Sequence, residues 1–270
     1  MRKILTIVLF VMILLSFIGF SYGRNYYTYN TIGASDNKYS IGVGVWSAEL
    51  AGDTFAPSTT FTTDLESDLG FGNTKALITF DFSYRFSNLN GAGVSFFSGS
   101  HKAVRTLTRN LTLPGDPSDV VVNSGTTVFT DINYSAFDLY YRRYFATETN
   151  YNFYGLLGIR FNNLSADFST STAPLASTEF NVATAYLGIG GDFKLSENIN
   201  AFYQAQGLSL SFSGEKINFI EYKLGLEYKF TQNWGLNIGY RYNNTKGEDD
   251  FSRSLKVKYQ GLTFGISGRF

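Results

Sequence analysis

The sequence predicts an all-β fold, a closed antiparallel up-and-down transmembrane β-barrel of about ten strands, with eight strands as the alternative. Three observations indicate this class: apolar and polar side chains alternate along ten segments, the apolar positions carry many large aromatic residues, and the chain ends on such a segment. Successive side chains of a strand point to opposite faces. The last segment therefore presents an apolar face of four large side chains, Leu262, Phe264, Ile266 and Phe270.

The composition fits a surface in contact with lipid. The chain is 44% hydrophobic and 17% aromatic but only 16% charged, whereas soluble domains are nearer one quarter charged. The absence of cysteine excludes disulfide frameworks and thiolate metal sites, and we expect no cofactor and no metal. Without Arg2 and Lys3, 20 basic residues remain from 22, against 22 acidic ones. This balance argues against a surface that binds nucleic acid.

The N-terminal segment predicts export. Arg2 and Lys3 precede an apolar run at residues 4–20 and then Ser21, Tyr22 and Gly23, which together resemble a secretory signal peptide cleaved after residue 23. The domain prediction is thus a signal peptide at 1–23 and a single barrel domain at 24–270. The alternative is an uncleaved anchor helix, but the run is at the short end of the ~17–25 residues that a span requires.

Strands follow from the alternation. We expect them near residues 38–46, 73–86, 92–108, 126–145, 151–169, 178–195, 199–212, 216–230, 234–246 and 254–270. Four connections, at 87–90, 146–150, 196–198 and 231–233, are short, while 47–72 and 109–125 are long. Bacterial membrane barrels have short periplasmic turns and longer external loops, which predicts that both termini are periplasmic.

Aromatic residues predict two interfacial girdles. One set lies beside the short turns and the C-terminus: Phe86, Phe145, Tyr151, Phe230, Trp234 and Phe270. A second set lies towards the long connections: Trp46, Phe71, Phe129, Phe168, Phe180 and Phe219. Such rings collect at the two membrane–water interfaces.

The two faces of the strands predict a lipid surface and a lumen. The lipid surface includes Ile78, Phe80, Phe82, Tyr84, Phe137, Leu139, Tyr141, Leu157, Ile159, Phe161, Leu187, Ile189, Tyr222, Leu224, Leu226, Tyr228, Leu236, Ile238 and Tyr240. The opposite face carries a mixed-charge lumen network of Asp81, Arg85, Asp138, Arg142, Arg160, Asp192, Lys194, Glu221, Lys223, Glu227, Lys229, Asn237, Arg241 and Arg269. A ten-strand lumen is small enough for side chains to fill, so a wide pore is not expected.

Several short segments carry a family resemblance. They are Asp68-Leu69-Gly70, Phe82-Ser83-Tyr84-Arg85-Phe86, Leu224-Gly225-Leu226-Glu227-Tyr228, Gly239-Tyr240-Arg241-Tyr242, Tyr259-Gln260-Gly261 and Gly268-Arg269-Phe270. With them the chain resembles small outer-membrane β-barrel proteins of Gram-negative bacteria and, more loosely, the superfamily of the outer-membrane protein A and outer-membrane protein W barrels.

The resemblance implies an integral protein of the cell outer membrane, in contact with lipids including lipopolysaccharide. The last strand, with Leu262, Phe264, Ile266 and Phe270, is similar to the signal read by the barrel assembly machinery. Transient partners would then be that machinery and periplasmic chaperones. A closed barrel needs no partner to cover an edge, so a monomer is expected.

Three functions follow as hypotheses. The first is a non-enzymatic barrel that supports outer-membrane integrity and passes small solutes along a narrow path. The second is a surface protein that binds a ligand through the connections 47–72 and 109–125. The third is a hydrolase or lipid-modifying enzyme centred on His101, the only histidine. Omptin outer-membrane proteases also have ten strands, but their pattern of paired acids with an Asp and a His is not evident here, and we expect no enzyme.

Overall fold

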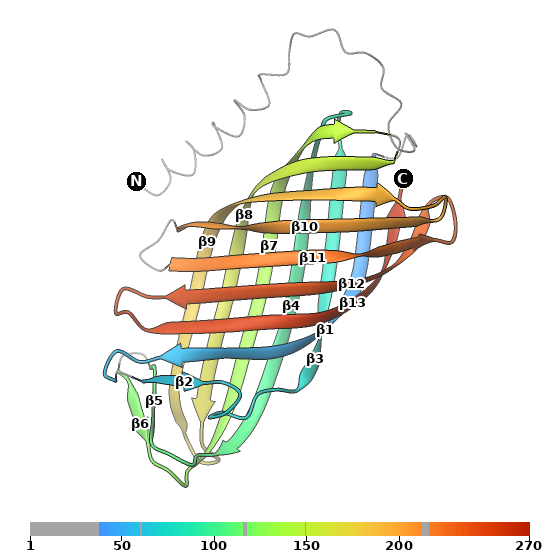
Figure 1. Cartoon of the computed structure of the whole chain (residues 1–270). Coiled ribbons are helices and arrows are strands. Elements are labelled where there is room, and N and C mark those ends of the chain that lie inside the picture. Colours follow the sequence, from blue (N-terminus) through green and yellow to red (C-terminus); the bar gives the residue numbers. More distant parts are fainter. Residues whose placement is uncertain (1–37, 60, 116–117, 149, 212–215) are drawn as a thin grey trace.

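Ten long strands form a single closed ring in the computed structural model (Figure 1), which describes residues 38–59, 61–115, 118–148, 150–211 and 216–270. The ring strands are β1 (Tyr39–Phe55), β3 (Thr74–Arg85), β4 (Asn90–Thr106), β7 (Thr127–Thr147), β8 (Tyr151–Ser169), β9 (Pro174–Lys194), β10 (Ile199–Ser211), β11 (Lys216–Lys229), β12 (Trp234–Glu248) and β13 (Ser254–Arg269). The signal peptide expected at 1–23 lies outside the described residues. Over the described ranges, no helix has the length and apolar character needed to span a membrane.

Antiparallel pairing closes the ring. Every ring strand pairs with its two neighbours, and β13 returns to pair with β1 from Ser40↔Arg269 to Phe55↔Ser254. A sheet that spans lipid must satisfy all its backbone hydrogen bonds internally, and closure achieves this. The expected closed antiparallel ten-strand barrel is confirmed.

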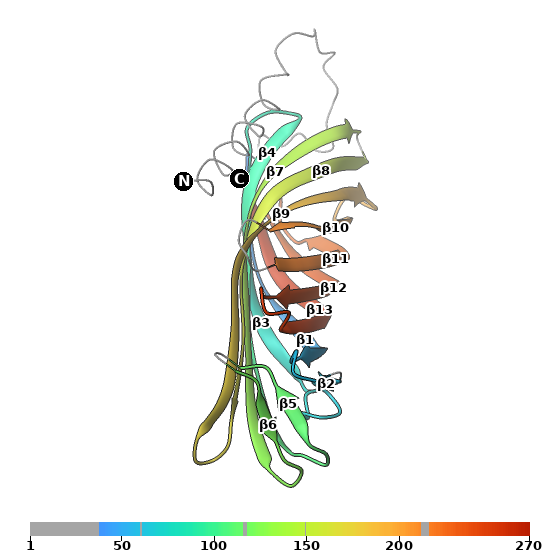
Figure 2. The ribbon, with the colours of Figure 1, turned by 90° about the vertical axis from the view of Figure 1, so that its left-hand side faces the viewer.

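Several strands are much longer than a membrane crossing requires. β7 and β9 have 21 residues and β8 has 19, whereas a tilted transmembrane strand needs about 9–11. The excess lies at the end of the long connections, which we call the loop end; the other end is the turn end. The short strands β2 (Thr62–Asp64), β5 (Leu111–Leu113) and β6 (Val120–Val122) gather at the loop end (Figure 2).

The strand boundaries expected at the loop end stop too early. The first strand was expected to end at residue 46 but runs to Phe55, and β9 begins at Pro174 instead of 178. Beyond Trp46 the outward side chains of β1 become polar, starting with Ser47 and Glu49, so the apolar alternation stops there. Backbone pairing with β13 nevertheless continues.

The two faces of the strands exchange character part-way along. In the half nearer the turns, called the membrane zone, outward residues of β7 are apolar and inward ones polar: Phe137, Leu139 and Tyr141 against Asp138 and Arg142. Nearer the loops, in the outer zone, outward residues are polar and inward ones apolar: Asp131, Asn133 and Ser135 against Ile132 and Tyr134. The outer zone is therefore built for water outside and a dry interior.

A packed apolar core fills the outer zone. Its members include Trp46, Leu50, Leu77, Phe97, Ile132, Tyr134, Leu164, Phe168, Phe180, Val257 and Tyr259. Their rings interlock: Phe97 meets Trp46 and Tyr134 edge-on, with centroids 5.7 and 5.0 Å apart. Native-like packing leaves no room for water between such side chains.

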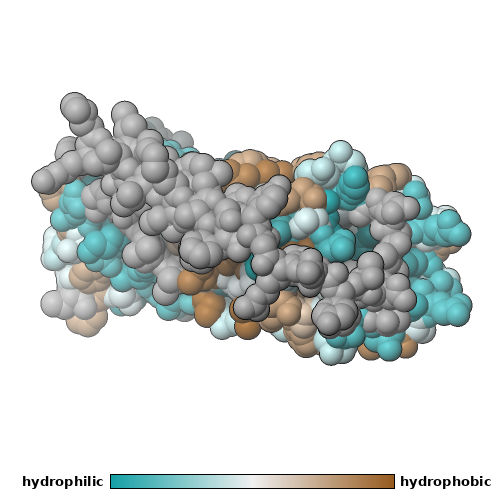
Figure 3. Space-filling view, turned by 90° about the horizontal axis from the view of Figure 1, so that it is seen from above, coloured by the Kyte–Doolittle hydropathy of each residue, from teal (hydrophilic) through white to brown (hydrophobic). Residues whose placement is uncertain are grey.

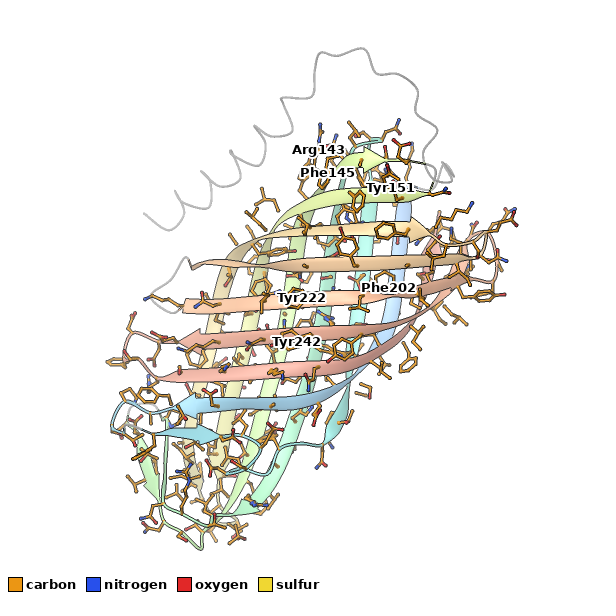
Figure 4. All side chains as sticks on the ribbon, viewed as in Figure 1. Arg143, Phe145, Tyr151, Phe202, Tyr222 and Tyr242 are labelled. Atoms are coloured by element: carbon orange, nitrogen blue, oxygen red, sulfur yellow. The ribbon has the colours of Figure 1, made fainter. Side chains whose placement is uncertain are left out.

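Of the two expected girdles, the one beside the turns is on the outer surface. Phe145 and Tyr151 project there at the turn end (Figure 4), and Phe86, Phe230, Trp234 and Phe270 are also exposed. The second girdle was wrong: Trp46, Phe71, Phe168, Phe180 and Phe219 are buried inside, and only Phe129 faces outward. Towards the loop end the apolar side chains of these strands are on the inward face, so the rings that were expected at the lipid interface belong to the core.

Other aromatics mark the loop-side limit of the apolar belt. They are Phe137, Phe161 and Tyr242, the last of which is labelled in Figure 4. On β7 the next outward residue is Ser135, on β8 it is Asn163, and on β12 it is Asn244. On β11 the belt extends beyond Tyr222, because the next outward residue is the exposed Ile220. Figure 3 shows hydrophobic surface along the flanks of the molecule and hydrophilic surface at its right-hand end, on the side of the turns that join β9 to β10 and β11 to β12.

Candidate functional site

The candidate site is the lumen of the membrane zone, where the structure places the expected charged residues. At its centre Glu221 is fully buried and joins three strands. Its Oε2 accepts hydrogen bonds from the guanidinium groups of Arg160 (3.2 Å) and Arg241 (2.8 Å), and Lys223 Nζ lies 3.3 Å from its Oε1. The amides of Gln206 and Asn243 donate to it at 3.2 and 3.1 Å.

Asp138 continues this central network on the far side of Arg160. The Arg160 guanidinium grips both Asp138 oxygens, with two hydrogen bonds of 2.7 Å, and Ser95 donates a third of 2.9 Å. Arg160 and Asp138 are 0% and 1% exposed. Bidentate, charge-assisted hydrogen bonds are the strong kind, and in a low-dielectric setting they fix geometry tightly.

The central network also contacts the apolar core, on the side of the core nearer the turns. The Arg160 guanidinium lies 4.0 Å from the ring centroid of Phe219, and that of Arg241 lies 4.4 Å from Phe97 and 4.7 Å from Trp46. A cation over an aromatic face is attracted by the ring quadrupole. Arg160 and Arg241 of the central network therefore lie directly against the rings at the membrane-zone side of the apolar core.

A second cluster lies near the turns, around Glu227. Arg269 Nη2 donates to its Oε2 at 2.6 Å, Asn200 donates to the same oxygen at 3.0 Å, and Ser267 donates to Oε1 at 2.7 Å. This cluster links β10, β11 and β13 just before the C-terminus.

A third cluster combines arginines with inward tyrosines. The Arg142 guanidinium lies 4.2 Å from the Tyr154 centroid, and its Nη1 donates to the hydroxyl of Tyr144 at 3.2 Å. Arg85 lies 4.3 Å from the centroid of Tyr144. Asp192 acts on Arg142 through its charge, without an ion pair of 4.0 Å or less in the described structure. Arg85, Arg142, Asp192 and Lys194, which the sequence predicts as members of one lumen network with Asp138, Arg160 and Glu221, therefore lie apart from the central network.

Inward tyrosines also bind neighbouring strands together through glycines. An added Cβ at Gly158 would come within 2.5 Å of the Tyr186 ring, and one at Gly190 would come equally close to Tyr154. Each ring therefore lies flat on a glycine of the adjacent strand. These contacts reduce the lumen further.

An open cavity remains between the central network and the turns. Its volume is about 740 Å³, and it reaches Ser87, Asn88, Glu197 and Gln232 at the turn end. Its deepest residues, Gln206, Lys223 and Arg241, belong to the central network. We call this cavity the turn-end vestibule; it ends at the network.

His101 lies in the outer zone, apart from this cavity. It is 2% exposed; its Nε2 is 3.4 Å from the carbonyl oxygen of Ala48, and its ring meets Tyr259 edge-on at 5.3 Å. Burial lowers the pKa of the imidazole. Among the described residues no carboxylate lies within ion-pair distance of it, and it is wedged in the apolar core.

The assembly-signal residues lie on the outer surface of β13. Leu262, Phe264 and Ile266 are each about half exposed, and Phe270 N and O form backbone hydrogen bonds with Tyr39 of β1 at 2.9 and 2.7 Å. The terminal residue is thus part of the seam that closes the barrel.

The outer core and the vestibule were both missed by the sequence reasoning. A signal for the first was present: on β7, inward Val128, Ile132 and Tyr134 have the opposite phase to outward Phe137 and Leu139. A reversal of the apolar phase within one unbroken strand indicates a change of solvent outside. The vestibule depends on which side chains face one another across the lumen, and strand alternation does not contain that information.

Comparison with known proteins gives a relationship of fold. No protein-family model matches the chain, and no curated protein matches it by sequence. Among solved structures, the outer membrane protease OmpT from Escherichia coli has a TM-score of 0.54 at 13% identity, with 89% of this chain and 99% of that chain covered.

Two further solved structures are more distant. The translocator domain of autotransporter NalP from Neisseria meningitidis has a TM-score of 0.43 at 10% identity, with coverage of 88% and 91%. The attachment invasion locus protein Ail of Yersinia pestis has 0.34 at 14%, with 87% and 99%. The likeness to the OmpT structure shows that the chain has the fold of an outer-membrane β-barrel.

Proposed function

We propose that this protein is a non-enzymatic integral barrel of the outer membrane, closed to solutes, that reinforces the membrane and holds a rigid outer zone above it. The observation that carries the proposal is the exchange of faces along the strands. The membrane zone keeps its charges inside, and the outer zone keeps an apolar core inside. The second arrangement suits a folded body in water and closes the lumen of the first.

The packed core argues against the narrow passive path that the sequence left open. A solute that entered the vestibule would have to displace the Arg160–Glu221 ion pair and then the rings of Phe97 and Trp46. Planar-bilayer recording of the refolded protein tests this: we expect no conductance steps above the empty-bilayer background. A porin of open lumen, inserted in the same bilayers, is the positive control, and reproducible steps from this protein would overturn the closed-barrel proposal.

Surface binding is a second candidate, favoured by the contacts that hold the connections at the loop end together. Arg109 binds both oxygens of Asp68 at 3.0 and 2.6 Å, and Ser58 Oγ donates to Asp119 at 2.6 Å. These contacts tie the connections 47–72 and 109–125 together. Deleting 109–125 should abolish adhesion of expressing cells if this candidate holds, while heat-modifiable migration on gels, a sign of a folded barrel, is retained.

An enzyme centred on His101 is the third candidate. Its burial and its carbonyl partner do not resemble a base oriented by an acid. A His101→Ala variant that retains any detected lipase or protease activity would eliminate this residue as the base.

Location and partners complete the proposal. We propose cleavage after residue 23, periplasmic termini, a monomer, contact with lipopolysaccharide and other outer-membrane lipids, and transient binding of chaperones and the assembly machinery. Membership of the superfamily of outer-membrane protein A and W barrels is proposed on the resemblance of the short motifs alone. Mass spectrometry of the outer-membrane form would test the cleavage, since a mature N-terminus other than Arg24 contradicts it.

A further inference from the structure

The turn-end vestibule has an imbalance of charge. Its walls carry eight lysine or arginine residues and four aspartate or glutamate residues. Three of the cations have carboxylate partners: Lys223 and Arg241 pair with Glu221, and Arg269 pairs with Glu227. The remaining cations are Lys38, Arg85, Arg142, Lys194 and Lys229.

The acids left to face these five cations are few. Of the four wall carboxylates, Glu227 pairs with Arg269 and Asp81 lies 3.9 Å from Lys223. The other two, Asp192 and Glu197, form no ion pair with the five cations in the described residues. Lys229 lies near two other cations, Arg269 and Lys194, as well as near the carboxylates of Glu227 and Asp192. A cleft that is lined by one sign of charge and walled by a low-dielectric medium concentrates ions of the opposite sign.

Arg142 is held in place with donor capacity unused. Its ring contact with Tyr154 and its bond to the Tyr144 hydroxyl fix the guanidinium, yet its buried Nε has no hydrogen-bond partner among the described residues. Arg85 lies over Tyr144 and also donates hydrogen bonds to the carbonyl oxygens of Ser87 and Asn88. An immobilised guanidinium with an unused donor, as in Arg142, suits the oxygens of phosphate or carboxylate.

Aromatic and small side chains supply the rest of the wall. Phe202, labelled in Figure 4, contributes an aromatic ring, while Gly42, Gly44 and Ser40 of β1 are small wall residues. The space of about 740 Å³ is of the size found for pockets that hold small organic molecules.

We infer that the turn-end vestibule is a binding site for a small organic anion bearing two or more phosphate or carboxylate groups, which enters from the turn end. Lys194, Lys229 and Arg85, each at the turn end of its strand, attract the ligand at the mouth, and Arg142 binds an anionic group deeper inside. The inference is independent of the closed-lumen proposal, because the site needs an entrance at one end only.

Calorimetric titration of the refolded protein in an uncharged detergent tests the inference. Pyrophosphate and citrate serve as the phosphate and carboxylate probes, at constant ionic strength maintained with chloride, because exposed charges are screened by salt. We expect saturable binding of one or both probes, and the probe that binds identifies the anionic group. A Lys194→Gln/Lys229→Gln double variant should weaken that binding at least tenfold.

The matched control is Lys258→Gln, which removes a lysine from the outer surface, where Lys258 lies 5.7 Å from the ring centroid of Tyr242. It should change affinity less than twofold. An Arg142→Met variant, with folding checked by heat-modifiable migration, should abolish binding. No saturable binding of either probe, unchanged affinity in the double variant, or an equal loss in the Lys258 control would each overturn the inference. None of these outcomes bears on conductance, which tests the closed barrel separately.

Discussion

Removing Arg160 is the most informative perturbation of the central network. Among the described residues Asp138 accepts side-chain hydrogen bonds from Arg160 and Ser95 only, whereas Glu221 retains Arg241 and Lys223 when Arg160 is lost. An Arg160→Met variant keeps the approximate volume and leaves Asp138 buried with a single hydroxyl partner. Breaking a buried pair from one side costs about 3–5 kcal/mol, and we assign most of this to the stranded carboxylate.

Removing the stranded charge should restore most of the loss. In Arg160→Met/Asp138→Asn the buried carboxylate is gone, and the remaining cost is that of imperfectly satisfied neutral groups, roughly 1–2 kcal/mol. The double variant should therefore be more stable than the Arg160→Met single variant. This order is unusual for mutations, since two destabilising changes far apart would simply add.

Urea unfolding of the refolded barrel in lipid vesicles measures these differences. The two tryptophans, Trp46 in the core and Trp234 near the turns, report on both zones by fluorescence. The reasoning is refuted if Arg160→Met costs less than 1 kcal/mol, or if the double variant is no more stable than the single one.

Three further variants or pairs test the rest of the architecture. Leu139→Arg, on the outward face of the membrane zone, should lower the free energy of unfolding by about 2–4 kcal/mol. Asn133→Arg, on the same face of the same strand in the outer zone, should change it by no more than about 0.5 kcal/mol. Equal losses for the two variants in vesicle unfolding would contradict the proposed membrane boundary. Gly158→Ala should cost about 1–3 kcal/mol because its Cβ would come within 2.5 Å of a tyrosine ring, and Gly155→Ala, whose Cβ would meet only a contact at 3.8 Å, is the control that should be near neutral. Burial lowers the pKa of His101, so as pH falls through about 6.5 the unfolded chain takes up a proton that the folded barrel resists, and stability decreases. As His101 is the only histidine, His101→Gln should flatten the unfolding midpoint between pH 7 and 5, and a slope that persists would assign the dependence elsewhere.

Sequence alternation was sufficient for the fold of the membrane zone. Strands such as Trp234–Glu248 combine regular outward Leu, Ile and Tyr with inward Asn and Arg, so both their existence and their facing could be inferred. The alternation did not predict the facing of residues in the outer zone, because it was interpreted as if lipid surrounded the whole length of each strand. Trp46 and Phe168 were assigned to an interface for that reason, although they belong to the core.

The candidate site was predictable in membership but not in grouping. Strand phase placed Asp138, Arg160, Glu221 and Arg241 on the inward face, because facing depends only on odd and even positions. Which cation meets which anion depends on barrel stagger and on side-chain length across the lumen. Arg160 reaches an acid 61 positions away in sequence, a distance that no local pattern encodes.

The exchange of faces also specifies strand register. A one-residue slip turns every side chain of a strand to the other face. In a strand with one uniform pattern, that slip is penalised by a single unfavourable environment, such as lipid around the polar side chains. On β7 a slip would put Asp138 and Arg142 into lipid and, in the same movement, put Ile132 and Tyr134 into water. A two-residue slip preserves the faces but moves the phase boundary relative to β8, so that Ser135 would no longer lie beside Asn163 at the edge of the belt. The pairing of Phe137 with Phe161 and of Ser135 with Asn163 therefore fixes both the facing and the height of each strand, and the tightly bound Arg160–Asp138 pair lies just inside that boundary.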